Sequence, residues 1–168
     1  STGICFIGER KFRDFLGRYL PARPGEIIST EGKSLGRRQG LMFHTIGQRQ
    51  GLGIGGVKDS SGEAWYVVDK DTEKNKLIVA QGKNHPSLFR RSLRARDLHW
   101  ISGTPPPIPL RCHARIRYRQ SDQDCDIREL NDDTAVVEFT TAQRAVTPGQ
   151  AVVFYAGDCC LGGGTIYA

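Results

Sequence analysis

No hydrophobic run in the sequence approaches the roughly 20 residues that a helix needs to cross a membrane, so we expect no membrane span. The sequence has 5 cysteines but no Cys-x-x-Cys pair, and its 4 histidines do not cluster with the thiols, so we expect no metal site. The cysteines show no spacing typical of a disulfide framework, and no signal peptide precedes them. These features favour a reducing, cytoplasmic setting.

Positive charge is in excess, with 24 Lys and Arg against 18 Asp and Glu and a net charge of +6. Such an excess makes a polyanionic partner a reasonable hypothesis without establishing one. The 168 residues suffice for one ordinary domain or two small ones. The chain starts at Ser1 and runs directly into patterned sequence, so we expect it to be part of a longer protein.

The first half of the chain contains one helix signal followed by strand signals. Apolar residues from Phe12 to Leu20 recur at helical spacing, which predicts a short amphipathic helix over residues 10–20 that Pro21 ends. Beyond it, β-branched runs between glycine-rich turns predict strands at 26–29, 65–68 and 77–80. We expect residues 1–20 to be the end of one domain and residues 21–90 to form a small central α+β or β domain.

The second half has the pattern of a small β-barrel. Residues 81–96 are basic and poorly patterned, which predicts a connector and a domain boundary near residue 90. The strands predicted after it lie at 98–101, 110–119, 124–130, 135–139, 151–155 and 165–167. Six short strands at this spacing predict a six-stranded antiparallel β-barrel over residues 91–168, with a sandwich as the alternative. The expected fold class is therefore mainly β with a short N-terminal helix.

Cys5 is the candidate reactive residue. It lies just before the predicted helix, whose first turn contains Arg10 and Lys11. A helix N-terminus and nearby cations stabilise the thiolate, which is the reactive form of cysteine. The alternative is that Cys5 is a small buried hydrophobic residue. We expect the other four cysteines to fill the core, because they lie in or beside predicted strands in apolar company: Cys112, Cys125, Cys159 and Cys160.

The predicted strand at 110–119 alternates basic and apolar side chains. One face would carry Arg111, His113, Arg115, Arg117 and Arg119, and the other face, which includes Tyr118, would point to the core. Arginines about 6.6 Å apart along a strand match the spacing of phosphates along one nucleic-acid strand. The pattern favours RNA contact, while a solvated face balanced by nearby acids is the alternative.

The glycine-rich motif at residues 51–56 does not predict a bound cofactor. Residues 51–56 formally match the G-x-G-x-x-G dinucleotide pattern, but a turn follows them where that pattern needs a helix. We therefore expect no cofactor within this chain.

Several motifs in order along the chain resemble the tRNA-specific 2-thiouridylase family. They are STGICFIGER at 1–10, FRDFLGRYL at 12–20, GLMFHTIGQR at 40–49, GLGIGG at 51–56, WYVVDKD at 65–71, RYRQ at 117–120, VTPGQ at 146–150 and CLGGG at 160–164. The resemblance covers the whole chain.

This resemblance implies a specific chemistry. Family members use ATP to adenylate the C2 carbonyl oxygen of the wobble uridine of certain tRNAs, and then deliver persulfide sulfur to that carbon. By the match of STGICFIGER, Cys5 would carry the persulfide, and a second cysteine outside this chain would release the sulfur by forming a disulfide. ATP with magnesium is expected in an amino-terminal domain, because the family's SGGVDS loop does not occur in this sequence. The chain alone is therefore predicted to be inactive.

The resemblance also names partners. In the family, RYRQ and the glutamine of VTPGQ lie in a barrel resembling domain two of elongation factor Tu and contact tRNA, so we carry Arg117, Tyr118 and Gln150 over as tRNA-binding residues, with Arg115 and Arg119 added from the basic face. The expected partners are tRNA and a sulfur-donor protein, either a cysteine desulfurase or a sulfur-relay carrier. The alternatives are a stand-alone RNA-binding barrel without catalysis, in which Cys5 is incidental, and a sulfur-carrier protein without RNA.

Overall fold

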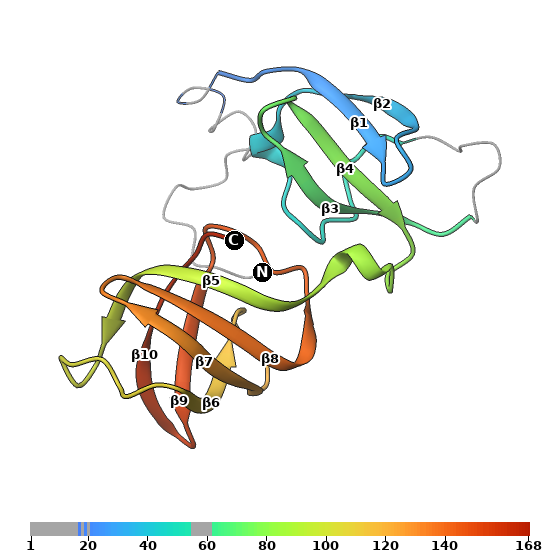
Figure 1. Cartoon of the computed structure of the whole chain (residues 1–168). Helices are drawn as coiled ribbons and strands as arrows, with labels where there is room; N and C mark the ends of the chain where they lie inside the picture. The colour runs from blue at the N-terminus through green and yellow to red at the C-terminus, as the bar shows by residue number, and fades with distance from the viewer. Residues whose placement is uncertain (1–16, 18, 20, 55–61) are drawn as a thin grey trace. The chain divides into compact units, whose positions relative to one another are not determined.

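The structure is a computed structural model that describes residues 17, 19, 21–54 and 62–168. The chain divides into two compact units, Ser1–Lys83 and Asn84–Ala168, and each is described by itself. Figure 1 shows the strands of both units. Gly17 and Tyr19 have helical conformation, but the remainder of the helix predicted over residues 10–20 lies outside the described residues.

The first unit contains a four-stranded mixed sheet with the order β2-β1-β4-β3. Strand β1 (Gly25–Ser29) pairs antiparallel with β2 (Ser34–Arg38) and parallel with β4 (Lys76–Gln81), which forms a hairpin with β3 (Trp65–Asp71). A short 3₁₀ helix, η1 (Leu41–Phe43), follows β2. Alternate strand residues such as Ile27, Val67 and Leu77 fill a common core, as expected for strands with one buried face.

The second unit is a closed six-stranded antiparallel barrel with the order β10-β5-β8-β7-β6-β9 (Figure 1). A 3₁₀ helix, η2 (Pro86–Leu88), precedes it, and the strands are β5 (Phe89–Trp100), β6 (Leu110–Arg115), β7 (Gln123–Asn131), β8 (Thr134–Arg144), β9 (Ala151–Ala156) and β10 (Cys159–Ile166). Fifteen buried residues, including Phe139 and Phe154, form one core inside it. The predicted mainly β fold with a six-stranded barrel is thus confirmed, and the sandwich is excluded.

Several strand limits differ from the predictions. Within the segment 81–96 that was expected to be a connector, residues 89–96 belong to β5, since Leu93 and Ala95 are buried while Arg94 and Arg96 are exposed. The arginines hid this alternation, because only Leu93 and Ala95 mark the inward face. Strand β2, with the sequence SLGRR, was not predicted, because it has a single apolar side chain and its buried position holds Arg38. Strand β10 begins at Cys159, well before the predicted Thr165, so Gly162, Gly163 and Gly164 lie within it.

These glycines allow the barrel to close. Strand β10 pairs with β5 on one side and β9 on the other. A Cβ atom on Gly162 would overlap the carbonyl oxygen of His99, and one on Gly163 would overlap the carbonyl oxygen of Val152. Gly162 also has a φ angle of 149°, which side-chain-bearing residues rarely adopt. The close approach of three strands therefore requires residues without side chains at these positions.

Candidate functional site

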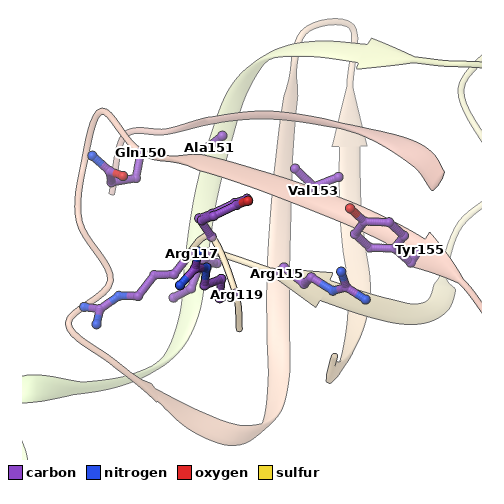
Figure 2. A pocket seen from close by; sticks show the side chains of 9 residues that line it. Arg115, Arg117, Arg119, Gln150, Ala151, Val153 and Tyr155 are labelled. Carbon is purple, nitrogen blue, oxygen red and sulfur yellow. The ribbon is translucent and has the colours of Figure 1, made fainter. Parts of the chain in front are cut away.

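A cavity of about 470 Å³ lies at the end of the barrel where β6 stops and β9 begins (Figure 2). Residues from two distant segments line it: Arg115, Ile116, Arg117, Tyr118, Arg119, Gln150, Ala151, Val153 and Tyr155. All five residues named as tRNA-binding are among them, whereas Arg111 and His113 of the predicted basic face are not. The lining contains three arginines and no acidic residue, so the cavity has a positive potential suited to an anionic ligand.

The strand predicted over residues 110–119 ends at Arg115, and the next residues form a turn. The Gln120 amide N–H donates to the Arg117 carbonyl at 3.2 Å, and Arg119 has a positive φ angle of 66°. The Gln120 side-chain oxygen accepts from the Ile116 amide N–H at 2.9 Å, which satisfies the backbone donor that leaves the sheet. The last part of the predicted basic face is therefore a turn that points into the cavity mouth.

This turn corrects the prediction for Tyr118. Strict alternation placed its side chain on the core face, but the ring is 91% exposed. The strand end explains the difference, because period-two alternation holds only within a strand. Tyr118 lines the cavity together with Arg117, Arg119 and Gln150. An exposed aromatic ring beside cations is an arrangement that stacks nucleic-acid bases in many RNA-binding proteins.

The three arginines differ in how they are held. The Arg117 guanidinium donates to the Ala145 carbonyl at 3.1 Å, and partial burial, together with the nearby Arg144, lowers the pKa of Arg117. Arg119 packs over the Tyr118 ring at 5.5 Å from its centroid. Neither of these two side chains has an acidic partner among the described residues, so both are available to a phosphate.

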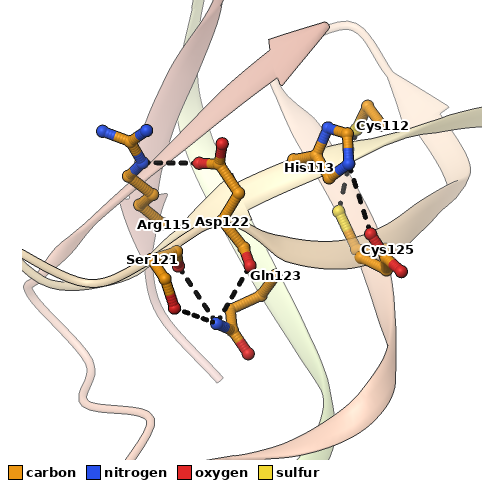
Figure 3. Close-up of polar contacts among 8 residues, drawn as sticks. Cys112, His113, Arg115, Ser121, Asp122, Gln123 and Cys125 are labelled. Atoms are coloured by element: carbon orange, nitrogen blue, oxygen red, sulfur yellow. Dashed lines mark hydrogen bonds and ion pairs between the residues drawn. The ribbon is translucent and has the colours of Figure 1, made fainter. Parts of the chain in front are cut away.

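Arg115 is held on two sides. Its Nε donates to Asp122 Oδ1 at 2.6 Å, and its guanidinium lies 4.6 Å from the centre of the Tyr155 ring (Figures 2 and 3). The hydrogen bond from Arg115 lowers the pKa of Asp122 below its usual value, and the same bond raises the pKa of Arg115. Asp122 and Tyr155 were not predicted as site residues. Asp122 is one of several acids that follow the basic segment, and Tyr155 reads as an ordinary strand residue.

Gln150 reaches the cavity from a different part of the chain. It ends the turn that precedes β9, where its amide N–H donates to the Thr147 carbonyl at 3.2 Å and Gly149 has a φ angle of 85°. Its carbonyl accepts from the Ile166 amide N–H at 2.8 Å, which fixes the turn against β10. The side-chain amide makes no hydrogen bond among the described residues, so it can offer both a donor and an acceptor to a ligand.

The other predicted site residues belong to the N-terminal segment. Cys5, Arg10 and Lys11 lie outside the described residues. Of the four cysteines expected in the core, Cys112 and Cys125 are buried in the barrel, but Cys159 and Cys160 are exposed near the β9–β10 turn.

In the described part of the chain, no group of three or more His, Cys, Asp or Glu residues is placed to hold a metal ion. No helix in that part is long and apolar enough to cross a membrane.

Comparisons with known proteins agree with this architecture. Residues 13–81 match a tRNA methyl transferase PRC-barrel domain, and residues 90–166 match an aminomethyltransferase beta-barrel domain. The chain is 61% identical over 166 residues to the tRNA-specific 2-thiouridylase MnmA of Salmonella typhimurium and 61% identical over 168 residues to that of Methylococcus capsulatus. The identity to the protein of Haemophilus influenzae is 59% over 166 residues. Each alignment covers 99% of this chain.

The fold and these matches define a protein that joins a PRC-barrel domain to an aminomethyltransferase-type β-barrel. The chain belongs to the tRNA-specific 2-thiouridylase family, as its motifs indicated. It spans about half of its curated relatives, 45% of the first two proteins and 43% of the third.

Proposed function

We propose that this chain is the tRNA-binding and sulfur-presenting part of a tRNA uridine 2-sulfurtransferase. In this proposal the barrel holds tRNA and Cys5 carries a persulfide to the wobble uridine. ATP with magnesium, held by a domain outside this chain, supplies the activation of the uridine C2 carbonyl oxygen, and a cysteine desulfurase or sulfur-relay carrier supplies the sulfur. The 59–61% identity to named 2-thiouridylases supports the overall activity.

The observation that carries the tRNA-binding part is the convergence of five residues on one cavity. Arg115, Arg117, Tyr118 and Arg119 come from the end of β6 and its turn, while Gln150 lies more than thirty positions later. The sequence pattern and the family motifs predict all five as tRNA-binding residues. Only folding of the barrel brings β6 and β9 together as neighbours.

The chemistry of the cavity suits an RNA segment. Arg117 and Arg119 have no acidic partner in the described structure and can each neutralise a phosphate. The exposed ring of Tyr118 offers a flat face for a base or ribose, and the Gln150 amide offers a donor and an acceptor. Arg115 is already paired with Asp122, so Arg117 and Arg119 carry the uncompensated positive charge of the cavity.

A salt titration of tRNA binding tests this interface. We expect Arg117→Ala and Arg119→Ala each to weaken tRNA binding by about tenfold or more and to reduce the slope of log K against log salt by about 0.7–0.9, the value for one lost phosphate contact. The control is Arg128→Ala, because Arg128 on β7 is already paired with Asp126 at 3.1 Å and with Glu138 at 2.9 Å.

Comparison of the three variants distinguishes a local interface from an effect of overall charge. If the cavity is the interface, the Arg128 variant binds tRNA with the affinity of the unchanged chain, while the Arg117 and Arg119 variants bind it more weakly. Equal losses in all three variants would show that only overall charge matters and would remove the cavity from the proposal.

The sulfur-presenting role of Cys5 needs the full-length protein. The surroundings of Cys5, with Arg10 and Lys11 close in sequence, favour a thiolate, and its motif matches the family's persulfide cysteine. We expect Cys5→Ser in the full-length protein to abolish 2-thiouridine formation, measured by nucleoside mass spectrometry, while tRNA affinity stays within about twofold. Unchanged thiolation would instead favour the alternative of an RNA-binding barrel in which Cys5 is incidental.

A further inference from the structure

Two cysteines face each other inside the barrel, outside the candidate RNA site. Cys112 on β6 and Cys125 on β7 are directly paired in the antiparallel register. Their side chains point into the core, where they are 5% and 2% exposed, and their Sγ atoms are 3.7 Å apart (Figure 3). Both thiols are free. The proposed function uses neither residue.

The strand register already provides the spacing of a disulfide. Directly opposed residues in an antiparallel pair have Cα atoms about 4.5–5.5 Å apart, which lies within the range of about 4.4–6.8 Å found in disulfides. The sulfur atoms need to approach by about 1.7 Å to reach the bonded distance, a movement that side-chain rotation can supply. The strands therefore do not have to separate or slide for the bond to form.

The other described cysteines differ in this respect. Cys159 and Cys160 follow one another on β10, so their side chains point to opposite faces of the strand, and both are exposed. Among the described cysteines, Cys112 and Cys125 alone form a facing pair, and the exposed cysteines serve as a comparison for reactivity.

We infer that Cys112 and Cys125 are an oxidation site, at which hydrogen peroxide converts the two thiols into a cross-strand disulfide within the barrel. The first sulfur attacks one oxygen of the peroxide and the O–O bond breaks. One water molecule leaves, and the attacking sulfur becomes a sulfenic acid. The second sulfur then attacks the sulfenic sulfur, the S–O bond breaks, and a second water molecule leaves. Two thiols and one hydrogen peroxide thus give one disulfide and two waters.

Either sulfur of the pair can react first, because either thiol can donate the hydrogen bond that joins them. Asp126 acts against ionisation of both thiols. The thiol that loses its proton attacks the peroxide, and its partner is the resolving thiol.

The position of the pair connects it with the candidate RNA site. The two cysteines are 13 positions apart, and the segment between them contains Arg115, the turn with Arg117 and Tyr118, and Asp122. A disulfide here closes a loop around that turn and restricts the unfolded chain. The oxidation itself does not depend on the proposed RNA binding, so either proposal can fail without the other.

Sequential labelling of the purified 168-residue chain tests the inference. Iodoacetamide first blocks the thiols that are accessible in the folded chain, and hydrogen peroxide is then added. After denaturation, N-ethylmaleimide marks the thiols that remain, and mass spectrometry maps the peptides. We expect Cys159 and Cys160 to carry the first label, and the peptides of Cys112 and Cys125 to be joined with the loss of two hydrogens and to separate on reduction.

Two further measurements sharpen the result. The oxidised chain should unfold at a midpoint higher by about 5 °C or more, and dithiothreitol should reverse the shift. In Cys125→Ala and in Cys112→Ala the disulfide cannot form, so the remaining thiol should accumulate as a sulfenic acid that dimedone traps. Cys160→Ser is the control and should form the same cross-link as the unchanged chain.

Three results would overturn the inference, and the first needs no variant. The first is that, in the oxidised, unchanged chain, N-ethylmaleimide labels both Cys112 and Cys125, or that these cysteines are joined to other cysteines. A bond that formed but lowered the unfolding midpoint would show that the barrel must distort to make it. If dimedone trapped no sulfenic acid in either alanine variant, the proposed sulfenic acid intermediate would be rejected.

Discussion

The glycine cluster of β10 provides a stability prediction whose size can be worked from the structure. In Gly162→Ala the new Cβ overlaps the His99 carbonyl oxygen and lies 3.0 Å from the Trp100 Cα, both on β5. Backbone atoms of a paired strand cannot rotate away, so the two strands must move apart. The φ angle of 149° adds conformational strain for any residue with a side chain.

These contributions can be added to give an expected loss. Strain at an unfavourable φ angle costs about 1–2 kcal/mol, and each ladder hydrogen bond that is weakened costs about 1 kcal/mol. Gly162→Ala should therefore destabilise the barrel by about 3 kcal/mol, which lowers the unfolding midpoint of a domain of this size by about 12–24 °C. Thermal unfolding followed by circular dichroism measures the shift.

Two matched variants separate strain from contact. Gly103→Ala also has a positive φ angle, 76°, but nothing lies within 4 Å of its added Cβ, so it should cost only about 1 kcal/mol. Gly163→Ala has no positive φ angle, but its Cβ overlaps the Val152 carbonyl oxygen, so it tests the contact by itself. If Gly162→Ala and Gly103→Ala lowered the midpoint equally, the reasoning from close strand approach would be refuted.

Three other variants test separate parts of the structure. Tyr118→Ala should leave the unfolding midpoint unchanged, because the ring is 91% exposed, but it should weaken tRNA binding by about 1–3 kcal/mol. Unchanged tRNA affinity would argue against base stacking on this ring. Gln143→Ala should cost about 1–3 kcal/mol in chemical denaturation, because the buried amide accepts from Gln120 and donates to Gln123 and to the Thr141 carbonyl. Burial and Arg38 lower the pKa of Lys70 from its ordinary 10.5, so the charge on Lys70 opposes folding at pH values below the lowered pKa. Lys70→Met should therefore raise the thermal unfolding midpoint at neutral pH, and this increase should shrink as the pH rises toward 10.5. Thermal melts at a series of pH values measure it.

The barrel was predictable from the sequence where strands alternate clearly. Residues 124–130 and 151–155 alternate or are apolar enough to identify, and the structure extends each by only one or two residues. The first half of β5 and all of β2 were missed. Only Leu93 and Ala95 mark the inward face of β5 among its arginines, and β2 has a single apolar side chain and buries Arg38. Pairing with neighbouring strands decides the conformation of such segments, and a single sequence does not display it.

The candidate site shows the same division. Residue types and motifs determined that Arg115, Arg117, Tyr118, Arg119 and Gln150 belong together, and the alternation of residues 110–115 determined which side chains face outward. Only the tertiary structure decided that the chain turns after Arg115, that Tyr118 is exposed, and that Asp122 and Tyr155 hold Arg115. The physical reason is that side-chain alternation is a local property of the backbone, whereas the end of a strand and the closure of a barrel depend on contacts between segments far apart in the chain.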